Sequence, residues 1–177
     1  MTTREKKEMT DWEIDQWSSH RLIMDPLLNS VHIRKAVELG AGRFSTRKLS
    51  EGCDNILSLE NNQDWATEMQ EELKDLKNLE ILCLEEDTEL WQEIGVHVPF
   101  DLLFVDHSGD RRRAVEEGMR HSIPYIILHD FTTEDEFAIN VEDGYQLFST
   151  RGLHFNPTAF YTNNRIVYSA FQSVQTQ

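Results

Sequence analysis

The stretch that most constrains the fold is residues 35–46, which read Lys-Ala-Val-Glu-Leu-Gly-Ala-Gly-Arg-Phe-Ser-Thr. Its apolar first half is typical of a buried strand, and Gly40 and Gly42 permit a tight turn in which the backbone approaches a ligand closely. We expect Ser45 or Thr46 to cap the following helix, because a hydroxyl there can accept hydrogen bonds from the free N–H groups of the first turn. This order predicts a small-ligand site at the carboxyl edge of a parallel sheet.

Two carboxylates accompany this turn. Glu38 lies at the end of the first strand, where it would repel a pyrophosphate and attract a cationic or amine-bearing ligand. Glu60 ends the next predicted strand, where a carboxylate can accept two hydrogen bonds from ribose hydroxyls. A dinucleotide-binding turn would have a third glycine at the position of Ser45. The pattern therefore disfavours a dinucleotide.

Predicted strands and helices alternate along most of the chain. Apolar runs predict strands at residues 34–39, 55–59, 79–84, 100–105 and 123–128, and helical spacing predicts helices between them, such as 62–77. Five such repeats are typical of an α/β doubly wound, mostly parallel, Rossmann-like sheet with helices on both faces. Further on, residues 145–150 predict a strand, and residues 158–162 and 165–171 predict an antiparallel hairpin around Asn163-Asn164. We therefore expect about seven strands, closed by a C-terminal antiparallel hairpin.

The first 30 residues predict a helical extension of a single domain that comprises the whole chain, residues 1–177. Thr10 and Glu13 fit a capping box for a helix that Pro26 should end. This helix either packs against the sheet edge or covers the ligand pocket with Trp12 or Trp17. No apolar run reaches the roughly 20 residues that span a membrane, and no secretory signal follows the polar start. A cytoplasmic location away from membranes is therefore expected.

The distribution of charge narrows the range of partners. The net charge is −15, and residues 60–93 contain twelve Asp or Glu and two Lys, which gives −10 for this segment. Such a surface repels phosphate backbones, so we expect a small-molecule substrate and no nucleic acid. Cys53 and Cys83 lack neighbouring histidines and are expected to be reduced thiols rather than zinc ligands.

The run Glu38-Leu39-Gly40-Ala41-Gly42, followed by Glu60, resembles the cofactor site of class I S-adenosylmethionine-dependent methyltransferases. It is most similar to a subset with a Gly-x-Gly-x-x-Ser-Thr loop and a Glu-x-x-x-x-Trp segment, which ends here at Trp65. The resemblance covers roughly residues 33–130, and it departs at Phe44, a position that is often glycine in that class. It implies S-adenosylmethionine as the cofactor, bound by these residues: Glu38, Gly40, Ala41, Gly42, Ser45, Thr46, Glu60, Asn61 and Asp106.

Two Asp/His pairs follow neighbouring strands of the implied sheet, Asp106-His107 after the fourth and His129-Asp130 after the fifth. Methyl transfer to a hydroxyl or amine requires a base, which His129 or His107 could supply, with the aspartates orienting the rings. We favour His129, because the unbroken apolar strand before it should hold its ring rigidly. Alternatively, Asp106 and Asp130 cap turns or bind a divalent metal, although no metal is expected. The remaining histidines, including His20, are interpreted as surface or packing residues.

Three functions are weighed on these residues. The first is methylation of a small-molecule acceptor on oxygen or nitrogen. The second is binding of S-adenosylmethionine or a nucleotide by a non-catalytic protein of the same fold. The third is a dinucleotide-dependent oxidoreductase, which Glu38 and the missing third glycine disfavour.

Overall fold

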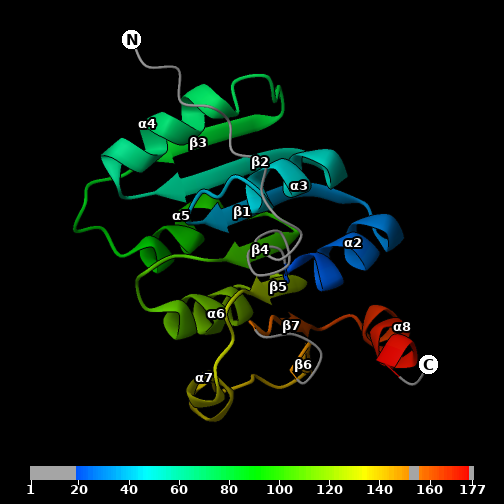
Figure 1. Ribbon diagram of the computed structural model, residues 1–177. Helices are drawn as coiled ribbons and strands as arrows, with labels where there is room; N and C mark the ends of the chain where they lie inside the picture. The colour runs from blue at the N-terminus through cyan, green and yellow to red at the C-terminus, as the bar shows by residue number, and fades with distance from the viewer. Residues whose placement is uncertain (1–18, 152–155, 176–177) are drawn as a thin grey trace.

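The computed structural model describes residues 19–151 and 156–175, which form one seven-stranded sheet with helices on both faces (Figure 1). The strand order is β3-β2-β1-β4-β5-β7-β6. Strand β7 runs antiparallel to both of its neighbours, β5 and β6, and all other neighbouring strands are parallel. The strands are β1 (Ile33–Leu39), β2 (Cys53–Glu60), β3 (Leu79–Cys83), β4 (Leu102–Val105), β5 (Tyr125–Leu128), β6 (Gln146–Ser149) and β7 (Ala159–Thr162). The predicted mostly parallel sheet with an antiparallel closure is thus confirmed.

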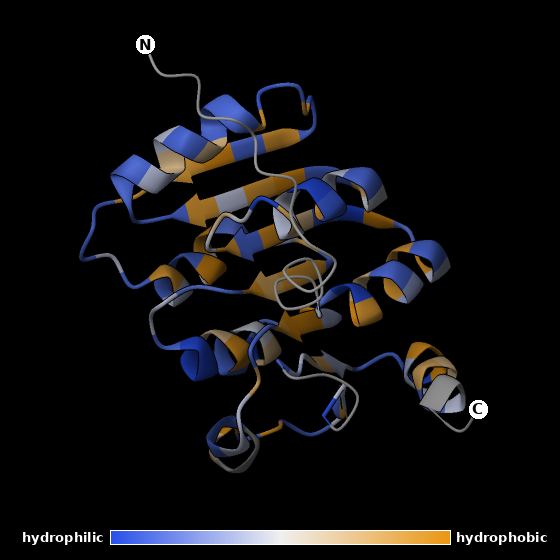
Figure 2. Ribbon diagram, viewed as in Figure 1, coloured by the Kyte–Doolittle hydropathy of each residue, from blue (hydrophilic) through white to orange (hydrophobic). Residues whose placement is uncertain are grey.

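The helices divide between the two faces of the sheet. On one face, side chains of α2 (Arg21–Ser30), α3 (Ser45–Gly52) and α8 (Arg165–Gln175) pack on the sheet. On the other face, η1 (Leu90–Glu93), α5 (Ile94–His97) and α6 (Arg111–Arg120) do the same. Strands β4 and β5 are buried and almost entirely apolar along their length (Figure 2), because both of their faces are covered. The remaining helices are α4 (Gln63–Glu72), shorter than predicted, and α7 (Thr133–Ala138).

The last predicted strand is wrong, because residues 165–175 form helix α8. The Asn164 side-chain oxygen accepts hydrogen bonds from the backbone N–H groups of Ile166 and Val167, which caps the helix. Val167 and Phe171, four residues apart, are buried against the sheet, whereas Ile166 is 84% exposed. The antiparallel closure is instead made by β6 and β7, which lie on either side of the segment 150–158.

Pro26 does not end the N-terminal helix, contrary to the prediction. It lies inside α2, whose buried residues Ile23, Met24 and Leu27 pack against the sheet. Burial of this face offsets the missing proline N–H and the crowding that a proline causes in a helix. The predicted capping box at Thr10 and the two N-terminal tryptophans lie outside the described residues.

Two further features of the described residues bear on the predictions. Cys53 is buried, Cys83 is partly buried, and both are free thiols. Among the described helices, none has the length and apolar character needed to cross a membrane. The single-domain organisation of residues 1–177 remains a prediction.

Candidate active site

The glycine turn after β1 is shaped by the neighbouring strand β4. Gly40 has φ +89°, a conformation that side chains rarely adopt, and a Cβ there would lie 2.3 Å from the backbone oxygen of Asp106. The backbone N–H of Asp106 in turn donates to the carbonyl of Leu39 at 2.9 Å. Gly40 is therefore required by the close approach of two backbones, which places the turn directly beside the end of β4.

Neither hydroxyl after the turn caps α3, so the predicted capping role of Ser45 and Thr46 is wrong. The helix begins at Ser45, and the residue at its N-cap position, Phe44, makes no side-chain cap hydrogen bond. The Thr46 hydroxyl instead donates to Glu38 Oε2 at 2.6 Å and accepts from the backbone N–H of Gly42 at 2.9 Å. Thr46 thus links the backbone of the glycine turn to the carboxylate of Glu38 through its hydroxyl group.

Glu38 is fully buried under the glycine turn and does not line the cavity described below. Its Oε2 accepts hydrogen bonds from Thr46 and Ser58, while Oε1 has no hydrogen-bond partner. Burial raises the pKa of Glu38 to about 7, and the surrounding hydroxyl groups only partly oppose this shift. Glu38 therefore supports the turn from below, and it does not present an exposed carboxylate to a ligand as the sequence suggested.

Glu60 braces the same turn from β2. Its Oε2 accepts the backbone N–H of Ala41 at 3.2 Å, and its Oε1 accepts those of Asn61 and Asn62 at 2.9 Å each. The side chain of Asn61 donates to the carbonyl of Thr88 at 3.0 Å. Both carboxylate oxygens of Glu60 are thus engaged with the backbone, which positions the end of β2 against the glycine turn.

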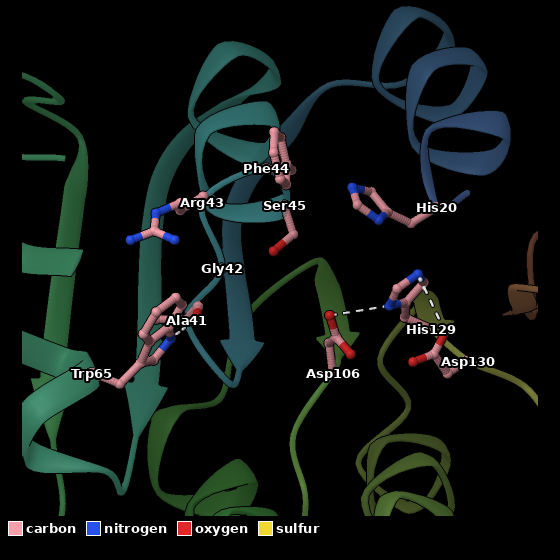
Figure 3. A pocket seen from close by; sticks show the side chains of 10 residues that line it. All are labelled: His20, Ala41, Gly42, Arg43, Phe44, Ser45, Trp65, Asp106, His129 and Asp130. Atoms are coloured by element: carbon pink, nitrogen blue, oxygen red, sulfur yellow. Dashed lines mark hydrogen bonds and ion pairs between the residues drawn. The ribbon is translucent and has the colours of Figure 1, made fainter. Parts of the chain in front are cut away.

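A cavity of about 440 Å³ joins the glycine turn to the ends of β4 and β5 (Figure 3). Its described lining residues are His20, Ala41, Gly42, Arg43, Phe44, Ser45, Trp65, Asp106, His129 and Asp130. Six of them were predicted as site residues: Ala41, Gly42, Ser45, Asp106, His129 and Asp130. The predicted residues outside this lining are Glu38, Gly40, Thr46, Glu60, Asn61 and His107.

His129 lies among three polar side chains at the end of β5. Its Nδ1 lies 3.1 Å from Asp106 Oδ2, an ion-pair contact without the alignment of a hydrogen bond, and its Nε2 lies 3.0 Å from Ser19 Oγ. Asp130 Oδ1 lies 3.7 Å from Nε2. Burial by itself would lower the pKa of His129, but the Asp106 and Asp130 carboxylates raise it above the ordinary value. The ring is therefore held in place, and its protonated form is stabilised by the two carboxylates.

His107 is not among the residues that line the cavity, although it follows Asp106 directly in the chain. Its Nδ1 accepts the backbone N–H of Gly109 at 2.9 Å, and its buried Nε2 has no hydrogen-bond partner. Burial, together with the positive charge of Arg111, lowers the pKa of His107 to about 4. His107 thus shapes the turn after β4, and the structure does not bring it to the cavity.

The sequence interpretation missed His20, which lines the cavity. Its ring is edge-on to His129 at a centroid distance of 5.1 Å and to Phe104 at 5.5 Å. Burial and the neighbouring His129 lower the pKa of His20 to about 3, so its imidazole is neutral. No local pattern could have indicated this role, because the packing of α2 on the sheet brings His20 to the site.

Trp65 and Arg43 form one wall of the cavity. The Trp65 indole N–H donates to the carbonyl of Ala41 at 2.6 Å, and the Arg43 guanidinium lies 5.0 Å from the Trp65 ring centroid. Arg43 also pairs with Glu68 and with Glu72 on α4. Trp65 was part of the motif that the sequence suggested, and the structure places it against the glycine turn.

Asp106, His129 and Asp130 also form a group with metal-ligand chemistry. One ligand atom from each lies within 4.8 Å of the others. Two carboxylates suit a hard divalent cation, but the third group is an imidazole already in contact with Asp106 and Ser19. The donor set is therefore a poor match for Mg²⁺, which prefers oxygen ligands.

No protein-family model matches this chain, and no curated protein matches its sequence. Solved structures do match its fold. The N-methyltransferase NodS from Bradyrhizobium japonicum WM9 has a TM-score of 0.60 and is 13% identical, and the match covers 89% of this chain and 100% of the NodS chain. NodS has also been solved in complex with S-adenosyl-L-homocysteine. The precorrin-6y C5,15-methyltransferase from Geobacter metallireducens GS-15 has a TM-score of 0.60 and 20% identity over 89% of this chain and 90% of its own.

A third protein of similar fold is named as a methyltransferase of RNA. The 23S rRNA methyltransferase ErmE has a TM-score of 0.57 and 13% identity over 82% of this chain and 68% of its own. At these identities the likeness concerns the arrangement of strands and helices. Together with the strand order and the glycine turn, it shows that this chain has the fold of the class I S-adenosylmethionine-dependent methyltransferases.

Proposed function

We propose that this protein is an S-adenosylmethionine-dependent methyltransferase that acts on a hydroxyl or amine of a small molecule. The observation that carries the proposal is the cavity in which the glycine turn meets Asp106, His129 and Asp130. In an open α/β sheet, ligands bind at the carboxyl ends of the strands, where this cavity lies. The cavity thus combines a surface suited to a cofactor with groups suited to moving a proton.

The cofactor would lie along the wall formed by Ala41, Gly42, Ser45 and Trp65. Glu60 would act indirectly by holding the turn, since its carboxylate oxygens bind the N–H groups of Ala41, Asn61 and Asn62. When bound, S-adenosylmethionine supplies an electrophilic methyl group. The protein then has to orient the acceptor and remove its proton.

His129 is the proposed base. The Asp106 and Asp130 carboxylates raise the pKa of His129, so the ring that has accepted the proton of the acceptor would be stabilised. Ser19 contacts the other ring nitrogen, so that the ring orientation is set from both sides. Asp106 and Asp130 are proposed as positioning groups for His129.

A small-molecule acceptor is favoured over RNA by charge. The net charge of −15, with −10 in residues 60–93, would repel a phosphate backbone. Because rRNA methyltransferases are among the proteins of similar fold, the acceptor class needs a direct test. A tritiated methyl donor offered with small alcohols, phenols and amines, and separately with total rRNA, should label only members of the small-molecule set.

The cofactor is tested by thermal unfolding and calorimetry. S-adenosylhomocysteine should raise the melting temperature, whereas NAD⁺ should leave it unchanged, because a ligand stabilises the fold only if it binds the native state. Trp65→Phe should weaken binding of S-adenosylhomocysteine, since it removes the indole bond to Ala41. Trp91→Phe is the matched control, because Trp91 also lies under an arginine, Arg113 at 5.2 Å, but does not line the cavity. Stabilisation by NAD⁺ alone would refute the proposal.

A non-catalytic cofactor-binding protein of the same fold is the alternative. It predicts binding of S-adenosylhomocysteine without methyl transfer to any acceptor. Once an acceptor is known, His129→Asn should keep cofactor binding and lose on the order of 10²–10⁴-fold in turnover. His107→Asn, which changes a histidine outside the cavity, should lose far less.

A further inference from the structure

His20 is built into the wall of the cavity, opposite the glycine turn (Figure 3). Its backbone carbonyl accepts the N–H groups of Ile23 and Met24 at 3.0 and 2.8 Å, which joins it to the start of α2. Ser19, the preceding residue, contacts His129 Nε2 at 3.0 Å and Thr158 Oγ1 at 3.4 Å. His20 is therefore anchored on both sides, and its ring position follows from the packing of α2 and from the contacts of Ser19.

The His20 ring has polar atoms without partners. Both ring nitrogens are buried, and neither has a hydrogen-bond partner among the described residues. Its ring contacts, to Phe104 and His129, are edge-on aromatic contacts that leave the nitrogens unsatisfied. Most buried polar side-chain atoms in proteins are hydrogen-bonded, so an exception in a cavity wall indicates a missing partner.

We propose that His20 is an acceptor-binding residue, which hydrogen-bonds the polar group of an uncharged or cationic alcohol, phenol or amine in this cavity. The proposal rests on the proposed methyltransferase function, and it adds the residue that binds the acceptor and the exclusion of anionic acceptors. A neutral imidazole has one donor and one acceptor nitrogen, so its acceptor nitrogen can accept a hydrogen bond from an O–H or N–H group. Two adjacent histidines, His20 and His129, would then contact the acceptor from the same wall.

The charges around the cavity favour the same class of acceptor. Asp106 and Asp130 are partly exposed in its wall and would repel a carboxylate or phosphate group. Among the described lining residues, the one with a permanent positive charge is Arg43, and it is already paired with Glu68 and Glu72. An anionic acceptor would therefore find no uncommitted cation in this lining.

The proposal is tested by nuclear magnetic resonance on protein labelled with ¹⁵N in histidine and saturated with S-adenosylhomocysteine. The His20 ring signals are assigned by their disappearance in His20→Gln. Catechol, tyramine and ethanolamine are the probes, and benzoate and inorganic phosphate are the anionic comparators. We expect at least one probe of the first group to shift the His20 ring nitrogens saturably, and neither anion to do so.

The variant His20→Phe keeps an aromatic ring beside Phe104 and His129 but has no nitrogen. It should bind the active probe roughly tenfold more weakly, as expected for loss of one hydrogen bond, with unchanged affinity for S-adenosylhomocysteine. His32→Phe, at an exposed histidine paired with Asp54, is the matched control. Should His20→Phe not fold, His20→Leu, which also has no hydrogen-bonding group in its side chain, provides the affinity comparison.

The outcomes separate the inference from the proposed function. If S-adenosylhomocysteine does not bind, the methyltransferase function fails. If it binds but no probe moves the His20 signals, or only benzoate or phosphate moves them, the role of His20 is refuted while the function stands. An unchanged probe affinity in His20→Phe would refute it as well.

Discussion

Nδ1 of His129 lies 3.1 Å from Oδ2 of Asp106, so the residues that follow two neighbouring strands are in contact in the cavity wall and form an ion pair when the ring is protonated. The sheet register accounts for this contact. Val105 on β4 pairs with Leu128 on β5, and the backbone N–H of His129 donates to the carbonyl of Val105 at 3.0 Å. Asp106 and His129 therefore come directly after a matched pair of residues and are brought side by side by the strands themselves.

Asp106→Asn should lower the pKa of His129, because it removes the carboxylate that stabilises the charged ring. The native pair contributes stability fully below the pKa of a histidine in the unfolded chain, and this contribution is lost as the pH rises through the raised pKa of His129. Titration of the His129 ring by nuclear magnetic resonance measures the shift. Asp143→Asn, at an exposed site, is the control. An unchanged His129 titration in Asp106→Asn would contradict the ion pair.

Glu38→Gln should flatten the pH dependence of stability. Burial raises the pKa of Glu38 to about 7, so in the native protein the stability associated with the neutral carboxyl is full below about pH 4.5 and is lost as the pH rises through 7. The pKa shift corresponds to a loss of about 3 kcal/mol in the free energy of unfolding as Glu38 ionises. Glutamine does not ionise, so Glu38→Gln should not show this loss. Urea unfolding between pH 5 and pH 8 measures this difference, with exposed Glu80→Gln as the control. Parallel curves for wild type and Glu38→Gln would contradict the buried carboxyl.

Gly40→Ala should destabilise the protein far more than Gly144→Ala. Both glycines have positive φ, +89° and +96°, so both substitutions carry the backbone strain of roughly 1–2 kcal/mol. A Cβ at Gly40 would also collide with the Asp106 backbone oxygen at 2.3 Å, whereas a Cβ at Gly144 meets nothing within 4 Å. Denaturant unfolding measures the loss of stability in each variant, and the difference between the two losses is the cost of the collision at Gly40. Equal losses would mean that β4 does not approach the glycine turn as closely as described.

Glu60→Ala should lower the stability of the free protein and weaken binding of S-adenosylhomocysteine by roughly 2 kcal/mol, because the glycine turn loses the carboxylate that holds it. Both effects follow because the substitution leaves the N–H groups of Ala41, Asn61 and Asn62 without their acceptor. Calorimetry measures the affinity, thermal unfolding measures the stability, and Glu85→Ala at an exposed position is the control. Unchanged affinity in a folded Glu60→Ala protein would show that cofactor binding does not depend on the support that Glu60 gives the turn.

Neither EDTA nor Mg²⁺ should change the melting temperature or the affinity for S-adenosylhomocysteine. One of the three grouped side chains is an imidazole that already contacts Asp106 and Ser19, and Mg²⁺ prefers oxygen ligands in an octahedral arrangement. The measurement compares EDTA-treated protein with protein in MgCl₂ and in KCl of equal ionic strength. A rise in melting temperature with Mg²⁺ that Asp130→Asn abolishes would instead establish a metal site.

The sequence alone predicted the features that depend on neighbouring residues. The strands before Gly40 and Asp106 were placed nearly correctly, because apolar runs between turn residues have few other stable conformations in a sheet. Asp110 precedes a helical segment of the sequence and is a residue type that caps helices, and its side chain accepts the N–H of Arg113 at 3.0 Å at the start of α6. The pairing of Asp106 with the residues after β5 could be anticipated because parallel strands end at one edge of the sheet.

The tertiary structure decided the features that depend on distant residues. Residues 165–171 fit a strand or a helix, and burial of Val167 and Phe171 against the sheet selects the helix. Glu38 appears in the sequence as an acid at a ligand edge, but Thr46 and Ser58 enclose it. No sequence pattern around His20 indicates a site residue. Helix α2 and Ser19 nevertheless bring its ring centroid to 5.1 Å from that of His129, which lies 109 positions later. The physical reason is common to all three: burial and hydrogen-bond partners are set by contacts between segments, which local spacing does not specify.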